Sequence, residues 1–126
     1  MKVLRTYYIF LLSSVVISQE NEAIKYEDLY ERKGLIYASD QDSSFNGTVN
    51  ENWPTGIKKL SYTYKNGKPD SKWSDWFNNG QPKEEVEYSN GIKNGLHKKW
   101  YKNGQQNFER TYKDGIHDGK WTEWYE

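Results

Sequence analysis

Residues 64–87 read YKNGKPDSKWSDWFNNGQPKEEVE, residues 88–111 read YSNGIKNGLHKKWYKNGQQNFERT, and residues 112–126 read YKDGIHDGKWTEWYE. Similar residues return every 24 positions, so this part of the chain is a repeat array. Such arrays present one surface again and again instead of enclosing a pocket, which favours a binding or structural role over an enzyme. The recurrent positions hold Tyr64, Tyr88 and Tyr112; Gly67, Gly91 and Gly115; Ser71, Gly95 and Gly119; Trp76, Trp100 and Trp124; Phe77, Tyr101 and Tyr125; and Gly80 and Gly104.

Asx-Gly dipeptides recur along the array and predict its fold. The turn glycines are Gly67, Gly80, Gly91, Gly104 and Gly115, each preceded by Asn or Asp. Asx-Gly is typical of a two-residue type I′ turn, because both central residues need positive φ. Two-residue turns join only antiparallel neighbours. The sequence therefore predicts an all-β antiparallel meander of hairpin repeats in a single elongated sheet, with strands near 57–65, 72–78, 81–89, 96–102, 105–113 and 120–125.

Register arithmetic sorts the side chains onto two faces of this sheet. A two-residue turn at Asn103-Gly104 places Trp100 opposite Asn107, Lys98 opposite Glu109 and Lys99 opposite Phe108. The same arithmetic at Asn79-Gly80 pairs Trp73 with Val86, Trp76 with Lys83 and Lys72 with Glu87. One face, here the core face, then collects Val49, Trp53, Leu60, Tyr62, Tyr64, Trp73, Phe77, Val86, Tyr88, Tyr101, Phe108, Tyr112, Trp121 and Tyr125.

The opposite face carries the candidate binding residues. Trp76, Trp100 and Trp124 form a row there, at a spacing of two strands or roughly 9–10 Å, beside the charge pair Lys98 and Glu109. One interpretation is structural, with each indole lying over a neighbouring lysine stem. The alternative is a binding row, because exposed tryptophans bury a large rigid area at low entropic cost.

The first residues are typical of an export signal. Lys2 and Arg5 precede an apolar run over residues 6–17 that is short for a bilayer span. We expect a signal peptide over residues 1–18, a linker or short capping helix over residues 19–34, and the repeat domain over residues 35–126. The mature chain would be exported, periplasmic or secreted, and an uncleaved N-terminal anchor is the alternative. The chain has no cysteine, which excludes a disulfide-stapled scaffold.

Charge and side-chain chemistry exclude several classes of function. Without Lys2 and Arg5, 16 basic residues face 18 acidic ones, whereas a nucleic-acid binder needs a basic face. His97 and His117 lack the spacing of a zinc site, and we expect His97 to be a solvated substitution where other repeats have Trp. Asp75 and Glu123 share one repeat position with Lys99, which indicates a charge ladder instead of an acid–base pair. We expect no catalytic residue, metal or cofactor.

The array resembles the MORN-repeat variant family, whose units read roughly Tyr-x-x-Gly-x-x-x-Gly-x-Trp-x-x-Trp-Tyr-x-x-Gly. The strings YKNGKPDSKWSDWFNNGQ, YSNGIKNGLHKKWYKNGQ and YKDGIHDGKWTEWYE carry the resemblance, which covers residues 45–126. Many bacterial members are named after YwqK-type antitoxins. The resemblance implies an all-β array of hairpins and an antitoxin-like role. Ser71 replaces the usual Gly and His97 replaces a Trp, and an export signal conflicts with neutralising a toxin in the cytoplasm.

Three hypotheses for the function follow. We favour an exported, non-enzymatic module that binds a protein partner, as an antitoxin or immunity protein would. The second hypothesis is a carbohydrate or cell-envelope binder whose aromatic row stacks on sugars. The third is a membrane-surface module, against which the balanced charge argues. The sequence alone does not identify the partner or the oligomeric state.

Overall fold

The computed structural model describes residues 23–125, so the expected signal peptide at residues 1–18 lies outside the described residues. Within residues 23–125, no helix is long and apolar enough to cross a membrane. The elements are η1 (Tyr26–Asp28), β1 (Leu29–Arg32), β2 (Leu35–Ala38), β3 (Gly47–Asn52), β4 (Lys58–Lys65), β5 (Lys68–Pro69), β6 (Ser71–Trp76), β7 (Pro82–Ser89), β8 (Ile92–Trp100), β9 (Gln106–Lys113), β10 (Ile116–His117) and β11 (Thr122–Glu123).

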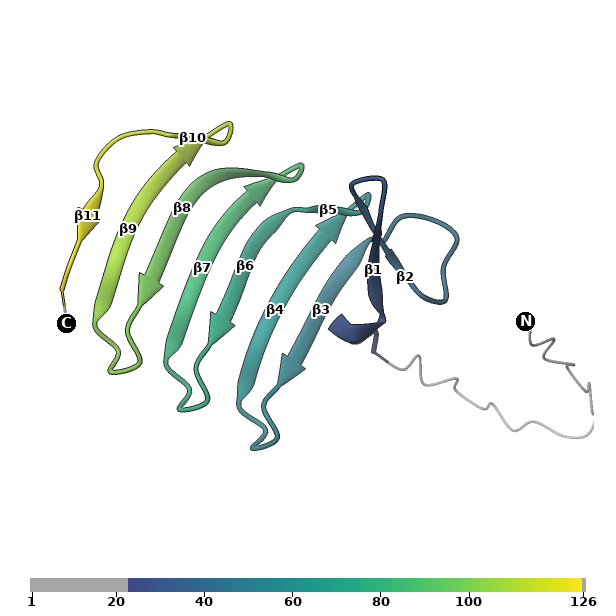
Figure 1. Cartoon of the computed structure of the whole chain (residues 1–126), viewed down its shortest axis with the longest axis horizontal. Helices are drawn as coiled ribbons and strands as arrows, with labels where there is room; N and C mark the ends of the chain where they lie inside the picture. Colours follow the sequence, from purple (N-terminus) through teal and green to yellow (C-terminus); the bar gives the residue numbers. More distant parts are fainter. Residues whose placement is uncertain (1–22, 126) are drawn as a thin grey trace, which may run out of the picture.

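The main sheet is an antiparallel meander, as the turn spacing predicts. Its strand order is β10-β9-β8-β7-β6-β4-β3, with β5 pairing β4 and β11 pairing β9. Hairpins follow one another along a curved sheet that has β3 near one end and β11 at the other (Figure 1). The all-β class and the antiparallel pairing are therefore confirmed.

The prediction of a single sheet is wrong, because β1 and β2 form a separate two-stranded hairpin. Residues 29–34, which we expected to be linker or helix, supply β1 and the turn of this hairpin. The only helical element found between residues 23 and 34 is the three-residue η1. Lys33 and Gly34 have φ of 53° and 76°, so a residue pair without the Asx signal makes the same kind of turn.

The buried core lies where the N-terminal segment meets the first strands of the main sheet. Ala38 and Phe45 lie against Val49, Leu60 and Tyr64, and all five are buried. Ile24, Leu29 and Ile36 pack around this cluster from the same N-terminal segment. Burial of apolar area contributes about 25 cal/mol per Å². The segment before the array therefore stabilises the first strands of the main sheet.

Two kinds of turn alternate along the array. The turns with Gly67, Gly91 and Gly115 have positive φ at both central residues, as type I′ requires. The turns with Gly80 and Gly104 were expected to be of the same type, but only their glycines have positive φ, at 85° and 88°. They are three-residue loops, because the amide of Phe77 donates to the carbonyl of Gln81 at 2.9 Å and that of Tyr101 to Gln105 at 2.8 Å.

A β-bulge next to each three-residue loop restores the register. Trp76 lies opposite Pro82, yet Asp75 lies opposite Glu84, so Lys83 is the extra residue. Asn107 is the extra residue at the next loop, where Trp100 lies opposite Gln106. The predicted pairs Trp76 with Lys83 and Trp100 with Asn107 are therefore wrong. Beyond the bulges the predicted pairs are confirmed: Trp73 with Val86, Lys72 with Glu87, Lys98 with Glu109, and Lys99 with Phe108.

The small-residue position marks a second irregularity. Ser71, Gly95 and Gly119 have φ of 62°, 119° and 87°. At Gly95 a Cβ atom would overlap the carboxylate of Glu87, which accepts a 2.7 Å hydrogen bond from the amide of Leu96. Gly is the residue that reaches this conformation without strain.

Side-chain oxygens tie each type I′ turn to the preceding hairpin. Asn46 Oδ1 accepts from the amide of Asn66 at 2.8 Å, and Asp70 Oδ2 accepts from the amide of Asn90 at 3.1 Å. The amide of Asp114 donates to Asn94 Oδ1 at 3.4 Å. Backbone bonds run in parallel, for example from the amide of Gly91 to the carbonyl of Pro69 at 2.7 Å. Neighbouring hairpins are therefore coupled at the turns as well as along the strands.

Gly67→Ala should destabilise the fold more than Gly34→Ala. Both glycines have positive φ, where an alanine costs about 1–2 kcal/mol. At Gly67 the added Cβ would also lie 2.8 Å from the carbonyl oxygen of Ile36, whereas nothing lies within 4 Å at Gly34. We expect a free energy of unfolding lower by roughly 1 kcal/mol for Gly34→Ala and by at least twice that for Gly67→Ala. Equal losses in urea unfolding would contradict the close approach of this turn to β2.

Candidate functional site

The candidate site is the row of Trp76, Trp100 and Trp124 on the opposite face. Trp76 and Trp100 are the last residues of β6 and β8, and Trp124 directly follows β11. One strand separates successive members, β7 in the first interval and β9 in the second. The amide of Trp124 donates to the carbonyl of Asn107 at 2.8 Å, which fixes the last member against β9. All three tryptophans therefore lie at the same end of the strands.

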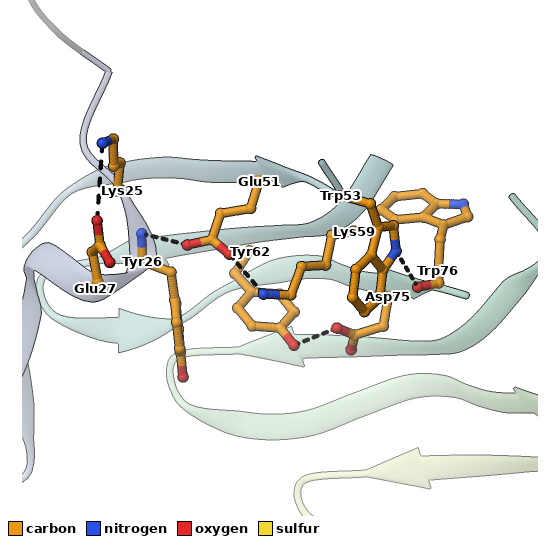
Figure 2. Close-up of polar contacts among 9 residues, drawn as sticks. All are labelled: Lys25, Tyr26, Glu27, Glu51, Trp53, Lys59, Tyr62, Asp75 and Trp76. Atoms are coloured by element: carbon orange, nitrogen blue, oxygen red, sulfur yellow. Dashed lines mark hydrogen bonds and ion pairs between the residues drawn. The ribbon is translucent and has the colours of Figure 1, made fainter. Parts of the chain in front are cut away.

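Indole hydrogen bonding distinguishes these tryptophans from Trp53 and Trp73 but not from Trp121, whose Nε1 has no partner within residues 23–125. Trp73 Nε1 donates to the carbonyl of Thr63 at 2.7 Å, and Trp53 Nε1 donates to the carbonyl of Trp76 at 3.2 Å. Figure 2 shows the second bond, with the Trp76 indole extending away from the contact between Tyr62 and Asp75. Within residues 23–125, the indole nitrogens of the row have no hydrogen-bond partner, so their donors remain available to a ligand.

Exposure of the row increases toward its C-terminal end. Trp76 and Trp100 are half-buried, whereas Trp124 is 42% exposed. Lys58 Nζ lies 5.7 Å from the ring centroid of Trp76, so a lysine stem covers part of this first indole. The structural interpretation is therefore supported for Trp76. A shallow hollow of about 390 Å³ adjoins the last member and is lined by Gln105, Gln106, Trp124 and Tyr125.

Several charged residues next to the row are paired. Lys98 Nζ lies 3.0 Å from Glu109 Oε2, so this predicted pair is an ion pair. The hydrogen bond from Lys98, aided by one from Gln106 at 3.1 Å, lowers the pKa of Glu109. Lys72 lies opposite Glu87 but forms its 2.8 Å ion pair with Glu85, because Glu87 accepts from the backbone of Leu96. A second hollow of about 150 Å³ is lined by Lys72, Glu85, Glu87, Leu96 and Lys98.

The core face is more polar than the sequence predicts. Trp73 stacks on Tyr62 with ring centroids 4.3 Å apart and also contacts Tyr64 and Tyr88. Tyr62 donates to Asp75 Oδ1 at 2.7 Å, and burial raises the pKa of both groups. Trp121 and Tyr125, expected in the core, are 55% and 89% exposed because β11 pairs only with β9. The remaining members of the predicted core face are buried or half-buried.

His97 is buried, with 6% of its surface exposed, so the expectation of a solvated histidine is wrong. Its ring packs edge-on against Phe108 at 4.8 Å. Glu84 Oε1 lies 2.7 Å from Nε2, and Lys93 Nζ lies 3.3 Å from Nδ1. The lysine ammonium can only donate, so Nδ1 accepts and Nε2–H donates to Glu84. The hydrogen bond from His97 is the main cause of the lowered pKa of Glu84.

The expected ladder of Asp75, Lys99 and Glu123 is not formed as a single chain of ion pairs. Asp75 accepts from Tyr62, Lys99 lies 3.8 Å from Glu84, and Arg110 donates to Glu123 at 2.9 Å. Each member is therefore paired within its own hairpin region. Residues 23–125 contain no group of three His, Cys, Asp or Glu side chains that could hold a metal ion.

Comparisons with known proteins do not identify the chain. No family model matches it, and neither a curated protein nor a solved structure matches it significantly.

Trp73→Ala should destabilise the fold far more than Trp100→Ala. Trp73 loses three ring contacts and a buried indole hydrogen bond, and truncation of such a tryptophan costs about 3–5 kcal/mol. Trp100 makes no ring contact or indole hydrogen bond within the described residues, so we expect a loss of about 1 kcal/mol. Urea unfolding monitored by circular dichroism measures both. A loss at Trp100 as large as that at Trp73 would make the row structural.

Glu84→Gln and Asp75→Asn should change stability with opposite dependence on pH. The pKa of Glu84 is lowered on folding, so its stabilisation is present above the unfolded value of about 4.3 and is lost as the pH falls. The pKa of Asp75 is raised by burial, so its carboxylate opposes folding as the pH rises above about 3.9. As the pH rises from about 2 to about 5, Glu84→Gln should fall behind the wild type, and as it rises above about 4, Asp75→Asn should gain on the wild type. Parallel unfolding curves at each pH test this, and shifts of the same sign would contradict it.

Proposed function

We propose that this protein is an exported, non-enzymatic binding module and that the Trp76–Trp100–Trp124 row is its contact surface. The observation that carries the proposal is the difference in indole hydrogen bonding. Trp53 and Trp73 use their indole donors within the fold, whereas the three tryptophans of the row leave theirs unused within the described residues. Tryptophan is enriched among the residues that dominate binding energy at interfaces.

The module is a repeat array related to the MORN-repeat variant family. Support comes from the recurrence of the same local structures at equivalent positions. The three-residue loops end in Gly56, Gly80 and Gly104, with φ of 85°, 85° and 88°. Asn46, Asp70 and Asn94 each accept a hydrogen bond from a later turn. The expected export signal at residues 1–18 supports a location outside the cytoplasm.

A protein partner is the first candidate ligand, in an antitoxin-like or immunity-like role outside the cytoplasm. The paired charges around the row suit a protein interface, because Lys98 and Glu109 can orient a partner without a strong net field. The same balance disfavours an anionic membrane surface. A carbohydrate is the second candidate, favoured by the regular spacing of the row.

Cross-linked capture from the exported fraction of the native host tests the binding role. The mature chain should retain a specific partner, and Trp100→Ala should reduce its recovery by about tenfold or more, as expected for a hot-spot residue. Tyr88→Phe is the matched control, because Tyr88 lies on the core face and its hydroxyl donates no hydrogen bond to another described residue. This control should capture as much as the wild type.

If circular dichroism shows that Trp100→Ala is folded and recovery of the partner is unchanged, the row is not part of the interface. Loss of recovery in both variants would instead indicate a partner that needs the core face.

A further inference from the structure

The row continues across the strands that separate its tryptophans. Trp76 lies opposite Pro82 on β7, and Trp100 lies opposite Gln106 on β9. The registers of β7 with β8 and of β9 with β11 continue to the bulge residues, so Lys83 comes next to Trp100 and Asn107 next to Trp124. Pro82 and Gln106 are uncharged and half-buried, whereas Lys83 is exposed. The strip at this end of the opposite face therefore consists of three indole rings separated by Pro82, Gln106 and Asn107, with Lys83 beside them and Lys58 over Trp76.

The spacing of the rings selects a ligand with a matching chemical repeat. Alternate strands are roughly 9–10 Å apart, so each tryptophan repeats the same presentation at this interval. In an extended β-1,4-linked pyranose chain, successive sugars are turned over relative to one another. Every second sugar therefore presents the same apolar face, at an interval close to that of alternate strands.

The polar side chains beside the strip suit a ligand rich in hydroxyl groups. Ser74, Glu85, Lys98, Glu109 and Thr122 lie opposite one another in adjacent strands and form a polar rung next to the strip. Their charges are compensated within the face, since Lys98 pairs with Glu109 and Lys72 with Glu85. The hollows beside Lys98 and Trp124 provide room for groups that project from a chain lying on the rings. The face therefore matches an uncharged polar polymer.

We propose that the row binds an extended β-1,4-linked glycan that crosses the strands, with one disaccharide for each tryptophan. This inference rests on the proposed role of the row as the contact surface. The inferred ligand is a β-linked glycan, and its chain runs across the strands. A plain hexose chain and an N-acetylated hexosamine chain share the required backbone.

Isothermal titration calorimetry of the mature chain with cello-oligosaccharides and chito-oligosaccharides tests the inference and distinguishes the two sources. A disaccharide reaches one tryptophan, a trisaccharide two and a pentasaccharide all three. We expect affinity to rise in steps at the trisaccharide and the pentasaccharide, with little gain at the tetrasaccharide. Maltopentaose, whose α-linkages curve the chain, should bind at least tenfold more weakly than the pentasaccharide of the preferred series.

Trp100→Ala should weaken pentasaccharide binding by about tenfold or more, because it removes the central platform. Tyr88→Phe should leave binding unchanged. Absence of saturable binding to both β-linked series would overturn the glycan inference, and so would an affinity that does not depend on Trp100. If Trp100→Ala nevertheless abolishes capture of a protein, the proposed function survives and the ligand class is wrong. If Trp100→Ala alters neither glycan binding nor capture, both proposals fail.

Discussion

The arrangement of both faces depends on two irregularities that compensate for each other at the ends of the strands. Each three-residue loop adds one residue, and the bulge at Lys83 or Asn107 adds one to the partner strand. Side chains alternate between faces with a period of two, so an uncompensated residue would move every later side chain to the wrong face. With the bulge present, Trp73 stays against Tyr62 while Trp76 and Trp100 lie on the other face.

A single-layer sheet has to obtain its burial from its own side chains. The β1–β2 hairpin covers the first strands, where Val49 is fully buried, but no second layer among residues 23–125 continues to β9. Farther along, Val86, His97 and Phe108 are covered by rings and by long charged side chains such as Arg110, which lies 4.5 Å from the Phe108 ring centroid. Burial is thus greatest next to the hairpin and least at β11, where Trp121 and Tyr125 are exposed.

The regular features of the fold were predictable because they follow from short-range chemistry. Asn66-Gly67 predicts its turn, and the pairing of Trp73 with Val86 follows from the register. The three-residue loop at Asn103-Gly104 was missed because Asx-Gly suits both turn types. The period of the repeat predicts the row of tryptophans. Only the structure shows that their indole donors are unused, because hydrogen-bond partners depend on the three-dimensional arrangement. The environment of His97 depends on Glu84 and Lys93, whose convergence no local pattern indicates.

Asn46, Asp70 and Asn94 each accept a hydrogen bond from the backbone of a later turn. Each hairpin is therefore joined to the one before it by the same kind of contact. Duplication or deletion of one whole unit inside the array would therefore recreate the same junctions. The number of tryptophans in the row would change by one, and their spacing would stay the same. In evolutionary terms, the length of the contact surface can change by whole repeats while the contacts between neighbouring hairpins stay the same.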